Sequence, residues 1–355
     1  RRTAKRRIAR REQRKTKGEK AHSREHTDIQ KRATAQEPIA SQEKGKWSHG
    51  KDENKHRYKD KQIGTIEKMK YGKGWWIATI NVRGTAERGG TKSIGKRDEV
   101  EEWMKTNDVV IALIQETRNE LNTRESRKEY TWYFSGENPI HKEYTAGLAI
   151  VIRNDHVKHL EDIVPINDRI MYCILKATMP ITIINIHAAQ AKRPTEEKER
   201  IYNQLNVIIR KRKNKGPLLI GGDWNARIQK AQNSAEREII GNHTFEPTTE
   251  RVSTLPEDVK ENRDKLIELC QEHDLIITNT RFRKPENKLA TYRTVGTKKT
   301  DPIARPTHEQ IDFILTTRRW KNAIVDAEAD AEANIDTDHN PVKVNTRIKL
   351  KGVQK

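Results

Sequence analysis

Asp223 and Asn225 lie in the stretch GGDWNA, residues 221–226, which directly follows the apolar run GPLLI. One residue separates the two polar side chains, so on an extended segment both would point to the same face. A carboxylate at such a position can orient or deprotonate a water molecule, while the amide holds that water or a phosphate oxygen. The stretch therefore predicts hydrolytic chemistry at the end of a buried strand.

Other polar side chains that could do chemistry lie at or near the ends of predicted strands. These residues are Asn81, Glu116, His187, Asp312, Asp338 and His339. Taken singly, such an Asp is most often a turn former or helix cap, and a lone His is usually structural. Each desolvated carboxylate, however, costs several kcal/mol unless a cation or a donor meets it. We therefore expect these side chains to share one pocket.

The ligand types in this set indicate the kind of metal. The set offers carboxylate and amide oxygens and two imidazoles, whereas Cys173 and Cys270 lie far from it inside apolar stretches. Oxygen-rich sites suit Mg²⁺ or Mn²⁺ and not zinc. A hydrated hard cation in such a site is suited to the hydrolysis of phosphate esters. The two separated cysteines are typical of buried thiols and exclude a disulfide framework.

The elements that must position these residues are short apolar strands alternating with polar helices. In the first helix Val100, Trp103 and Met104 share one face. We expect a single large α/β domain, with sheets packed together and helices outside them. The segment 228–260 is predicted to be a long surface connection with little regular structure. The predicted strands cover residues 75–82, 109–116, 146–153, 171–178, 181–189, 217–223, 275–280, 309–317 and 341–348, and the predicted helices cover 96–106, 194–212 and 261–274.

Residues 1–70 differ from the rest of the chain in charge. They hold 23 Lys and Arg against 10 Asp and Glu, a net charge of +13 out of the +20 of the whole chain. Because they lack apolar periodicity, we interpret them as a disordered basic arm. The arm is either a solubilising tail or a contact for nucleic-acid phosphates, DNA or RNA, that overlaps a nuclear import signal. The sequence shows neither a membrane span nor a secretory signal, so we expect a nuclear protein that is not secreted.

The order of these motifs resembles the endonuclease/exonuclease/phosphatase superfamily. Over residues 77–342 the chain carries, in order, an Asn after the first strand, QE, a strand ending in His, GDWN, QIDFIL and DH. Within the superfamily it is most similar to the apurinic-endonuclease-like endonuclease domain of non-LTR retrotransposons, through EEKERIYNQL, KLIELCQEHDLIITNT and HEQIDFILTTRRW. The resemblance implies a two-sheet sandwich flanked by helices, the four-layer α/β/β/α DNase I-like fold, over residues 71–348. Residues 349–355 would begin a polar linker to a reverse transcriptase domain.

The resemblance also implies an activity and a role for each motif residue. The chain would be a Mg²⁺- or Mn²⁺-dependent endonuclease that nicks DNA, leaving a 3′-hydroxyl as the primer for integration. Glu116 would be the principal metal ligand, with Asn81 beside it and Asp338 near or on the cation. Asp223 would activate the water and Asn225 would hold the scissile phosphate. His339, oriented by Asp312, would contact the phosphate.

Three positions depart from the family pattern. Arg83 stands where apurinic-site endonucleases carry Asp, two positions after the first Asn, and Thr337 stands where Ser is common. The sequence His187-Ala188-Ala189-Gln190 replaces a Tyr followed by Pro and Asn, and it is similar to the pancreatic-type deoxyribonucleases, whose His is a general acid. We therefore expect His187 to protonate the leaving oxygen, with a pKa near ~6.5, or else to be a structural His.

Two other functions fit parts of the same pattern. A phosphomonoesterase acting on phosphoinositides or nucleotides would share the metal-site skeleton, although the basic arm argues against it. A catalytically inactive remnant that still binds nucleic acid would keep the arm, although the expected catalytic positions are occupied apart from the departures above. Cleavage assays on plasmid DNA and on soluble inositol phosphates would separate these alternatives.

Overall fold

Two mixed β-sheets form the centre of the structure, a computed structural model that describes residues 74–85, 95–136, 146–245, 252–304 and 307–350. The first sheet has the order β14 (Ile324–Ala329), β15 (Val342–Thr346), β1 (Trp75–Asn81), β2 (Val109–Gln115), β5 (Leu148–Arg153), β4 (Tyr130–Ser135) and β3 (Arg124–Ser126). The second has the order β10 (Leu275–Ile277), β13 (Asp312–Thr317), β9 (Leu218–Asp223), β8 (Ile181–His187), β7 (Ile170–Leu175) and β6 (Leu160–Pro165). A small third sheet pairs β11 (Tyr292–Arg293) with β12 (His308–Glu309).

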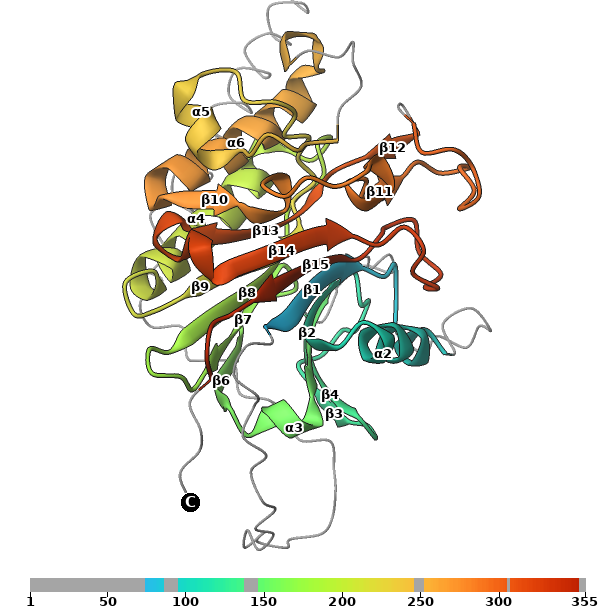
Figure 1. Cartoon of the computed structure of the whole chain (residues 1–355), viewed down its shortest axis with the longest axis vertical. Helices are drawn as coiled ribbons and strands as arrows, with labels where there is room; N and C mark the ends of the chain where they lie inside the picture. The colour runs from blue at the N-terminus through green and yellow to red at the C-terminus, as the bar shows by residue number, and fades with distance from the viewer. Residues whose placement is uncertain (1–73, 86–94, 137–145, 246–251, 305–306, 351–355) are drawn as a thin grey trace, which may run out of the picture. The chain divides into compact units, whose positions relative to one another are not determined.

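Helices cover the outer faces of the two large sheets. The α-helices are α2 (Lys96–Thr106), α3 (Asn154–Val157), α4 (Thr195–Arg212), α5 (Ser234–Ile239) and α6 (Glu257–His273). Short 3₁₀ turns span η2 (Val252–Thr254), η3 (Thr278–Thr280), η4 (Glu286–Lys288) and η5 (Arg318–Ala323). In Figure 1, α4, α5 and α6 lie on the side of the second sheet and α2 lies on the side of the first.

Alternation along the strands separates the layers, because successive side chains point to opposite faces of a sheet. In β1, Ile77 packs into the apolar core between the sheets, whereas Ala78 and Ile80 pack outward with the α2 side chains. In β9, Leu219 faces the same central core, whereas Leu218 and Ile220 pack under α4 and α6. The result is the four-layer α/β/β/α sandwich, so the predicted fold class is confirmed.

Buried polar side chains join the two sheets inside this core. Gln115 Nε2, on β2, donates to Asn185 Oδ1 on β8 at 2.6 Å and to Thr79 Oγ1 on β1 at 2.9 Å. The Asn185 amide in turn donates to the Ile114 and Ala149 carbonyls of the first sheet. Buried polar groups are costly unless they are hydrogen-bonded, so these contacts set the position of one sheet against the other.

Several elements were not expected from the sequence. The strands β3, β4, β6, β11 and β14 lie in segments with no predicted strand, and β12 shares only Glu309 with the strand predicted over 309–317. The prediction of an irregular 228–260 connection was wrong in part, because α5 lies within it and α6 already begins at Glu257. Ile228 and Ile239 from this segment are buried in the core beneath α6, so burial orders it.

The basic arm and the linker that the sequence predicts at the two ends of the chain lie largely outside the described residues. The basic arm, residues 1–70, and the linker 349–355 apart from its first two residues are not described. The described strands run from Trp75 to Thr346, within the 71–348 range expected for the domain, and belong to one compact unit, Gly45–Lys355. Within the described part of the chain, the helices are too short or too polar to cross a bilayer. Both cysteines are buried free thiols, as predicted.

Candidate active site

The predicted site residues meet at one edge of the two sheets. In the second sheet, β8 runs parallel to β9 and places His187 beside Asp223, and the antiparallel β13 places Asp312 on the other side of Asp223. In the first sheet, β1 runs parallel to β2, so Asn81 ends level with Gln115, immediately before Glu116. Since parallel strands end at the same edge, chain direction alone gathers these side chains.

Asn81 links the two sheets at this edge. Its Nδ2 donates to Glu116 Oε1 at 2.9 Å and to Asp223 Oδ2 at 3.1 Å. Its Oδ1 accepts the backbone N–H of Arg83. His187 lies close by, with Nε2 at 3.8 Å from Glu116 Oε1 and 3.9 Å from Asp223 Oδ2. The amide therefore holds the two carboxylates in fixed positions.

The chain turns sharply after Asp223 instead of staying extended, which corrects the sequence interpretation of this stretch. Asn225 adopts a left-handed backbone with φ of 50°, and its N–H donates to Asp223 Oδ1 at 3.0 Å. Between them the fully buried Trp224 donates from Nε1 to the Phe313 carbonyl and anchors the turn in the core. Asn225 Nδ2 donates to the Ala188 carbonyl, which orients this amide at the site.

Asp312 and His339 form the His–carboxylate pair expected from the sequence. His339 Nδ1 lies 3.0 Å from Asp312 Oδ2 and 3.2 Å from Oδ1, and Nε2 lies 3.9 Å from Asp223 Oδ2. Burial lowers the pKa of His339, but the carboxylates of Asp312, Asp223 and Asp338 outweigh burial and raise it to about 10. His339 is therefore an imidazolium at neutral pH.

The segment that carries Asp338 is tied to the first sheet. Thr337 Oγ1 donates to the Asn81 carbonyl at 2.8 Å and accepts the His339 N–H at 3.3 Å. Thr337 thus keeps a hydroxyl at a position where the family often has Ser, and the structure uses it. Asp338 Oδ2 pairs with Arg83 NH1 at 2.9 Å.

Two further groups in the site have shifted pKa values. Burial and the nearby Asp312 carboxylate raise the pKa of Asp223 to about 7. Burial, the Arg169 guanidinium and His339 lower the pKa of His187 well below its ordinary value. The expectation of an ordinary pKa for His187 is therefore wrong, because the ring is buried beside a cation.

The backbone is strained at three positions around the site. Arg83, Glu116 and Asn225 have φ values of 53°, 53° and 50°. Left-handed conformations of residues other than glycine cost free energy and concentrate at functional sites, where surrounding contacts hold them. The strained backbone at Glu116 and Asn225 is consistent with a functional role for these two residues.

Oxygen atoms at this edge fit a hard divalent cation. The side chains of Asp223, Asp312 and His339 offer ligand atoms that all lie within 4.8 Å of one another, so this acidic cluster could hold a metal ion. However, the imidazolium of His339 already balances charge there. Asp338 Oδ1 is buried and finds no hydrogen-bond partner among the described residues. Asp338, Glu116 and the Asn81 amide oxygen, which accepts the Arg83 N–H, are the oxygen ligands expected from the sequence, and oxygen is the donor that such a cation prefers.

Sequence reasoning missed two residues that contact the site. Arg169 NH1 lies 3.0 Å from His187 Nδ1, and the Tyr292 ring packs against His339 with ring centroids 5.0 Å apart. Arg169 immediately precedes β7, and Tyr292 forms part of the two-residue strand β11. Neither belongs to a motif that ends a long apolar run, so the sequence carried no signal for them.

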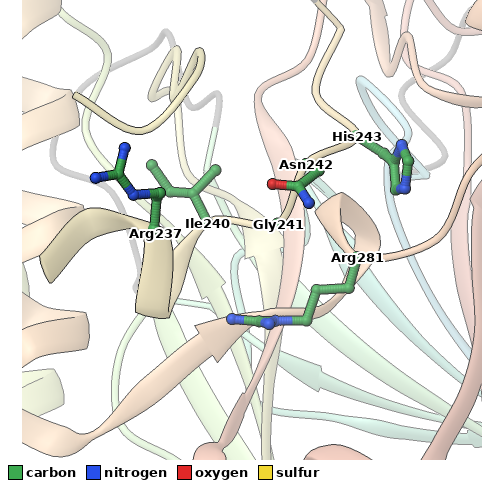
Figure 2. A pocket seen from close by; sticks show the side chains of 6 residues that line it. All are labelled: Arg237, Ile240, Gly241, Asn242, His243 and Arg281. Carbon is green, nitrogen blue, oxygen red and sulfur yellow. The ribbon is translucent and has the colours of Figure 1, made fainter. Parts of the chain in front are cut away.

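A separate hollow of about 150 Å³ lies away from the motif residues. It is lined by Arg237, Ile240, Gly241, Asn242, His243 and Arg281. Figure 2 shows the Arg281 side chain beneath the segment that runs from Ile240 to His243. These lining residues, all within the described ranges, include no carboxylate, so the hollow is basic and does not match the hydrolytic site.

Comparison with known proteins agrees with this geometry. The family model described as the Endonuclease/Exonuclease/phosphatase family matches residues 78–339, a range that includes every motif residue discussed above. The chain belongs to this family. The assignment to the endonuclease/exonuclease/phosphatase family predicted from the sequence is therefore confirmed, and with it membership of a group of hydrolytic nucleases and phosphatases.

Individual relatives of this family member are distant. Craniofacial development protein 2 from Bos taurus is 26% identical over 284 residues, which cover 79% of this chain and 42% of that protein. The chain thus spans less than half the length of this curated relative. An AP endonuclease from Leishmania major is 13% identical with a TM-score of 0.58, covering 78% of this chain and 88% of its own, which supports the fold. The endonuclease domain of TRAS1, a telomere-specific non-LTR retrotransposon, is 17% identical with a TM-score of 0.49, over 78% of this chain and 99% of its own.

Proposed function

We propose that this chain is a divalent-metal-dependent endonuclease that hydrolyses a phosphodiester bond of DNA and leaves a 3′-hydroxyl. The observation that carries the proposal is the row of His187, Asp223 and Asp312 in register across the second sheet, facing Asn81 and Glu116 of the first. The row holds Asp223, a carboxylate of raised pKa, and the imidazolium of His339 lies beside it against Asp312. Such groups suit the attack of water on a phosphate diester.

Each residue contributes a distinct step. Asp223 takes a proton from the attacking water, as its pKa of about 7 allows, while Asn225 orients that water or the phosphate. The water oxygen bonds to phosphorus, and the bond between phosphorus and the 3′ oxygen breaks. His339, held by Asp312, faces the phosphate with a positive charge that offsets the negative charge growing there.

The metal site is part of the same proposal. Glu116, Asn81 and Asp338 would hold Mg²⁺ or Mn²⁺, and a bound cation would supply Lewis-acid stabilisation of the extra negative charge on the phosphate. Glu116 is suited to this because Asn81 occupies only one of its two carboxylate oxygens among the described contacts. Arg118 lies 3.9 Å from the other oxygen.

DNA is the substrate that best fits the charge of the chain. The net charge of +20 favours a polyanion over a small phosphate ester. The sequence motifs shared with non-LTR retrotransposon endonucleases support a role in target-primed integration, with a linked reverse transcriptase extending the new 3′-hydroxyl. In this proposal the basic arm contacts DNA or RNA, and the protein works in the nucleus.

A direct comparison of substrates tests the function. Purified full chain is incubated with supercoiled plasmid, soluble inositol phosphates and mononucleotides, each with Mg²⁺ or Mn²⁺. We expect nicked plasmid whose ends a DNA polymerase extends, and no phosphate release from the small esters. Release of phosphate from inositol phosphates with intact plasmid would support a phosphomonoesterase. DNA binding without any hydrolysis would support an inactive nucleic-acid-binding protein.

A further inference from the structure

The two ring nitrogens of His187 face different surroundings. Nδ1 lies 3.0 Å from Arg169 NH1, and the His187 backbone N–H donates to the Arg169 carbonyl at 2.9 Å. Nε2 points to the opposite side, toward Glu116 and Asp223. The side chain is 3% exposed, so the ring is held by protein on both sides.

The contact with Arg169 decides which ring nitrogen carries the proton. A guanidinium has only N–H donors and no acceptor, so His187 Nδ1 must accept this hydrogen bond. A ring nitrogen that accepts carries no hydrogen, and the remaining proton of a neutral imidazole is then on Nε2. Arg169 therefore selects the Nε2–H tautomer by geometry alone.

Arg169 is itself held in place. Asn167 Oδ1 accepts its backbone N–H at 2.9 Å as well as the N–H of Ile170 at 2.8 Å. Its other guanidinium nitrogen, NH2, lies 4.0 Å from Glu197 Oε1, and only 15% of the side chain is exposed. This guanidinium is largely shielded from solvent and lies next to the Glu197 carboxylate, which restricts the direction in which it donates to His187.

The Nε2–H of His187 is an unused donor inside the site. It lies 3.8 Å from Glu116 Oε1 and 3.9 Å from Asp223 Oδ2, beyond hydrogen-bond distance from both. Within the described ranges this nitrogen has no hydrogen-bond partner although it is buried. A phosphate oxygen bound beside the expected metal ligand Glu116 and the expected base Asp223 would meet this donor.

We infer that His187 acts as a neutral hydrogen-bond donor to a non-bridging phosphate oxygen, and that Arg169 is the positioning residue that fixes its tautomer. The inference rests on the proposed phosphodiester hydrolysis and replaces the general acid expected from the sequence. A preorganised N–H aimed at growing negative charge stabilises the transition state without giving up its proton. The proton that the leaving 3′ oxygen requires then comes from solvent.

The tautomer can be measured without any activity. Full chain with ¹⁵N-labelled histidine is studied by long-range ¹H–¹⁵N NMR at pH 7 in EDTA, and the His187 signals are identified by their loss in His187→Gln. We expect an unprotonated Nδ1 and a protonated Nε2. A doubly protonated ring, or a hydrogen on Nδ1, would overturn the inference.

The role of Arg169 is tested by a double-mutant cycle in the plasmid assay. Arg169→Met removes the donor and is expected to lower kcat by about 10- to 100-fold with little change in KM, as for other residues that orient a functional group. In a His187→Gln background the same change should have almost no further effect. Arg210→Met is the matched control, because it removes a guanidinium from an exposed pair with Glu272 and leaves the Arg169–His187 bond in place, so it should keep both tautomer and rate.

The outcomes separate this inference from the proposed function. Equal losses from Arg169→Met with and without His187 would show that Arg169 does not act through the ring. If the wild-type chain shows the expected tautomer but does not cut DNA, the substrate and the donor role are overturned while the Arg169–His187 bond stands.

Discussion

Arg83 NH1 lies 2.9 Å from Asp338 Oδ2, so a guanidinium occupies one oxygen of a carboxylate that is expected to lie near or on the metal. Arg83 stands where apurinic-site endonucleases, which this chain resembles, carry an acidic residue. The pair exposes 49% of the Arg83 side chain and 16% of Asp338. In the proposed metal site, the Arg83 guanidinium stands where a relative has a ligand, so it would compete with the metal ion for Asp338.

Removing this cation should tighten metal binding. Arg83→Asn keeps a residue that tolerates the left-handed backbone and leaves Asp338 free. Because the ion pair is half exposed, it is worth at most about 1 kcal/mol, so the dissociation constant for Mn²⁺ should fall by about two- to fivefold. Isothermal titration calorimetry of the metal-free chain measures this, with Arg97→Gln, which loses a remote pair with Glu125, as the control. Weaker or unchanged binding in Arg83→Asn would contradict the competition.

The Asp312–His339 pair predicts the pH at which kcat/KM falls on the alkaline side. His339 has its pKa raised to about 10 by the surrounding carboxylates, so it loses its positive charge only as pH rises through that value. In Asp312→Asn the ring keeps the burial that lowers its pKa but loses the largest opposing carboxylate. The alkaline fall in kcat/KM should therefore move to lower pH in this variant. If the wild type and Asp312→Asn lose kcat/KM at the same alkaline pH, His339 is not the group whose titration causes the loss.

The Thr337 hydroxyl predicts a difference between two conservative substitutions. Thr337→Ser keeps the bond to the Asn81 carbonyl, whereas Thr337→Val keeps the shape and loses the hydroxyl. A buried hydrogen bond contributes about 1 kcal/mol, so urea denaturation should show a loss of that order for the Val variant alone. Nicking should also fall in the Val variant, because Asp338 and His339 follow directly. Equal behaviour of the two variants would mean that the hydroxyl does not position this segment.

The basic arm predicts a change in salt dependence. Residues 1–70 carry +13 of the net charge of +20, and phosphate contacts release counterions when they form. Deletion of residues 1–60 should weaken DNA binding and reduce the slope of log affinity against log salt concentration. Fluorescence anisotropy with a labelled duplex measures both. An unchanged slope would leave the arm without a role in binding.

The location of the site could be predicted from the sequence because strand ends carry its information. Asp223, His187 and Asn81 each close an apolar run, and chain direction then brings parallel strand ends together. Asp312 could be predicted for the same reason, since it opens the antiparallel strand beside Asp223. Short apolar runs likewise predicted the central strands, and helical periodicity predicted the buried face of α2.

The remaining features depend on contacts between segments that are distant in the sequence. The strand β4, YTWYFS, mixes aromatic and polar side chains, and its buried position follows from packing in the first sheet. The role of Arg169 depends on its contact with His187. The turn at Asn225 depends on the burial of Trp224 in the core. Such pairings leave no periodic pattern and no motif, so the sequence could not indicate them.

Metal-dependent nicking of supercoiled plasmid by the purified full chain is the measurement that tests the central claim most directly. With Mg²⁺ or Mn²⁺ the wild-type chain should convert supercoiled plasmid to open circles. EDTA should stop the conversion, and Glu116→Gln, which keeps the size of the side chain but loses the ligand charge, should reduce it by at least about 100-fold. Equal nicking by the wild type in EDTA, or by Glu116→Gln with metal, would contradict the account.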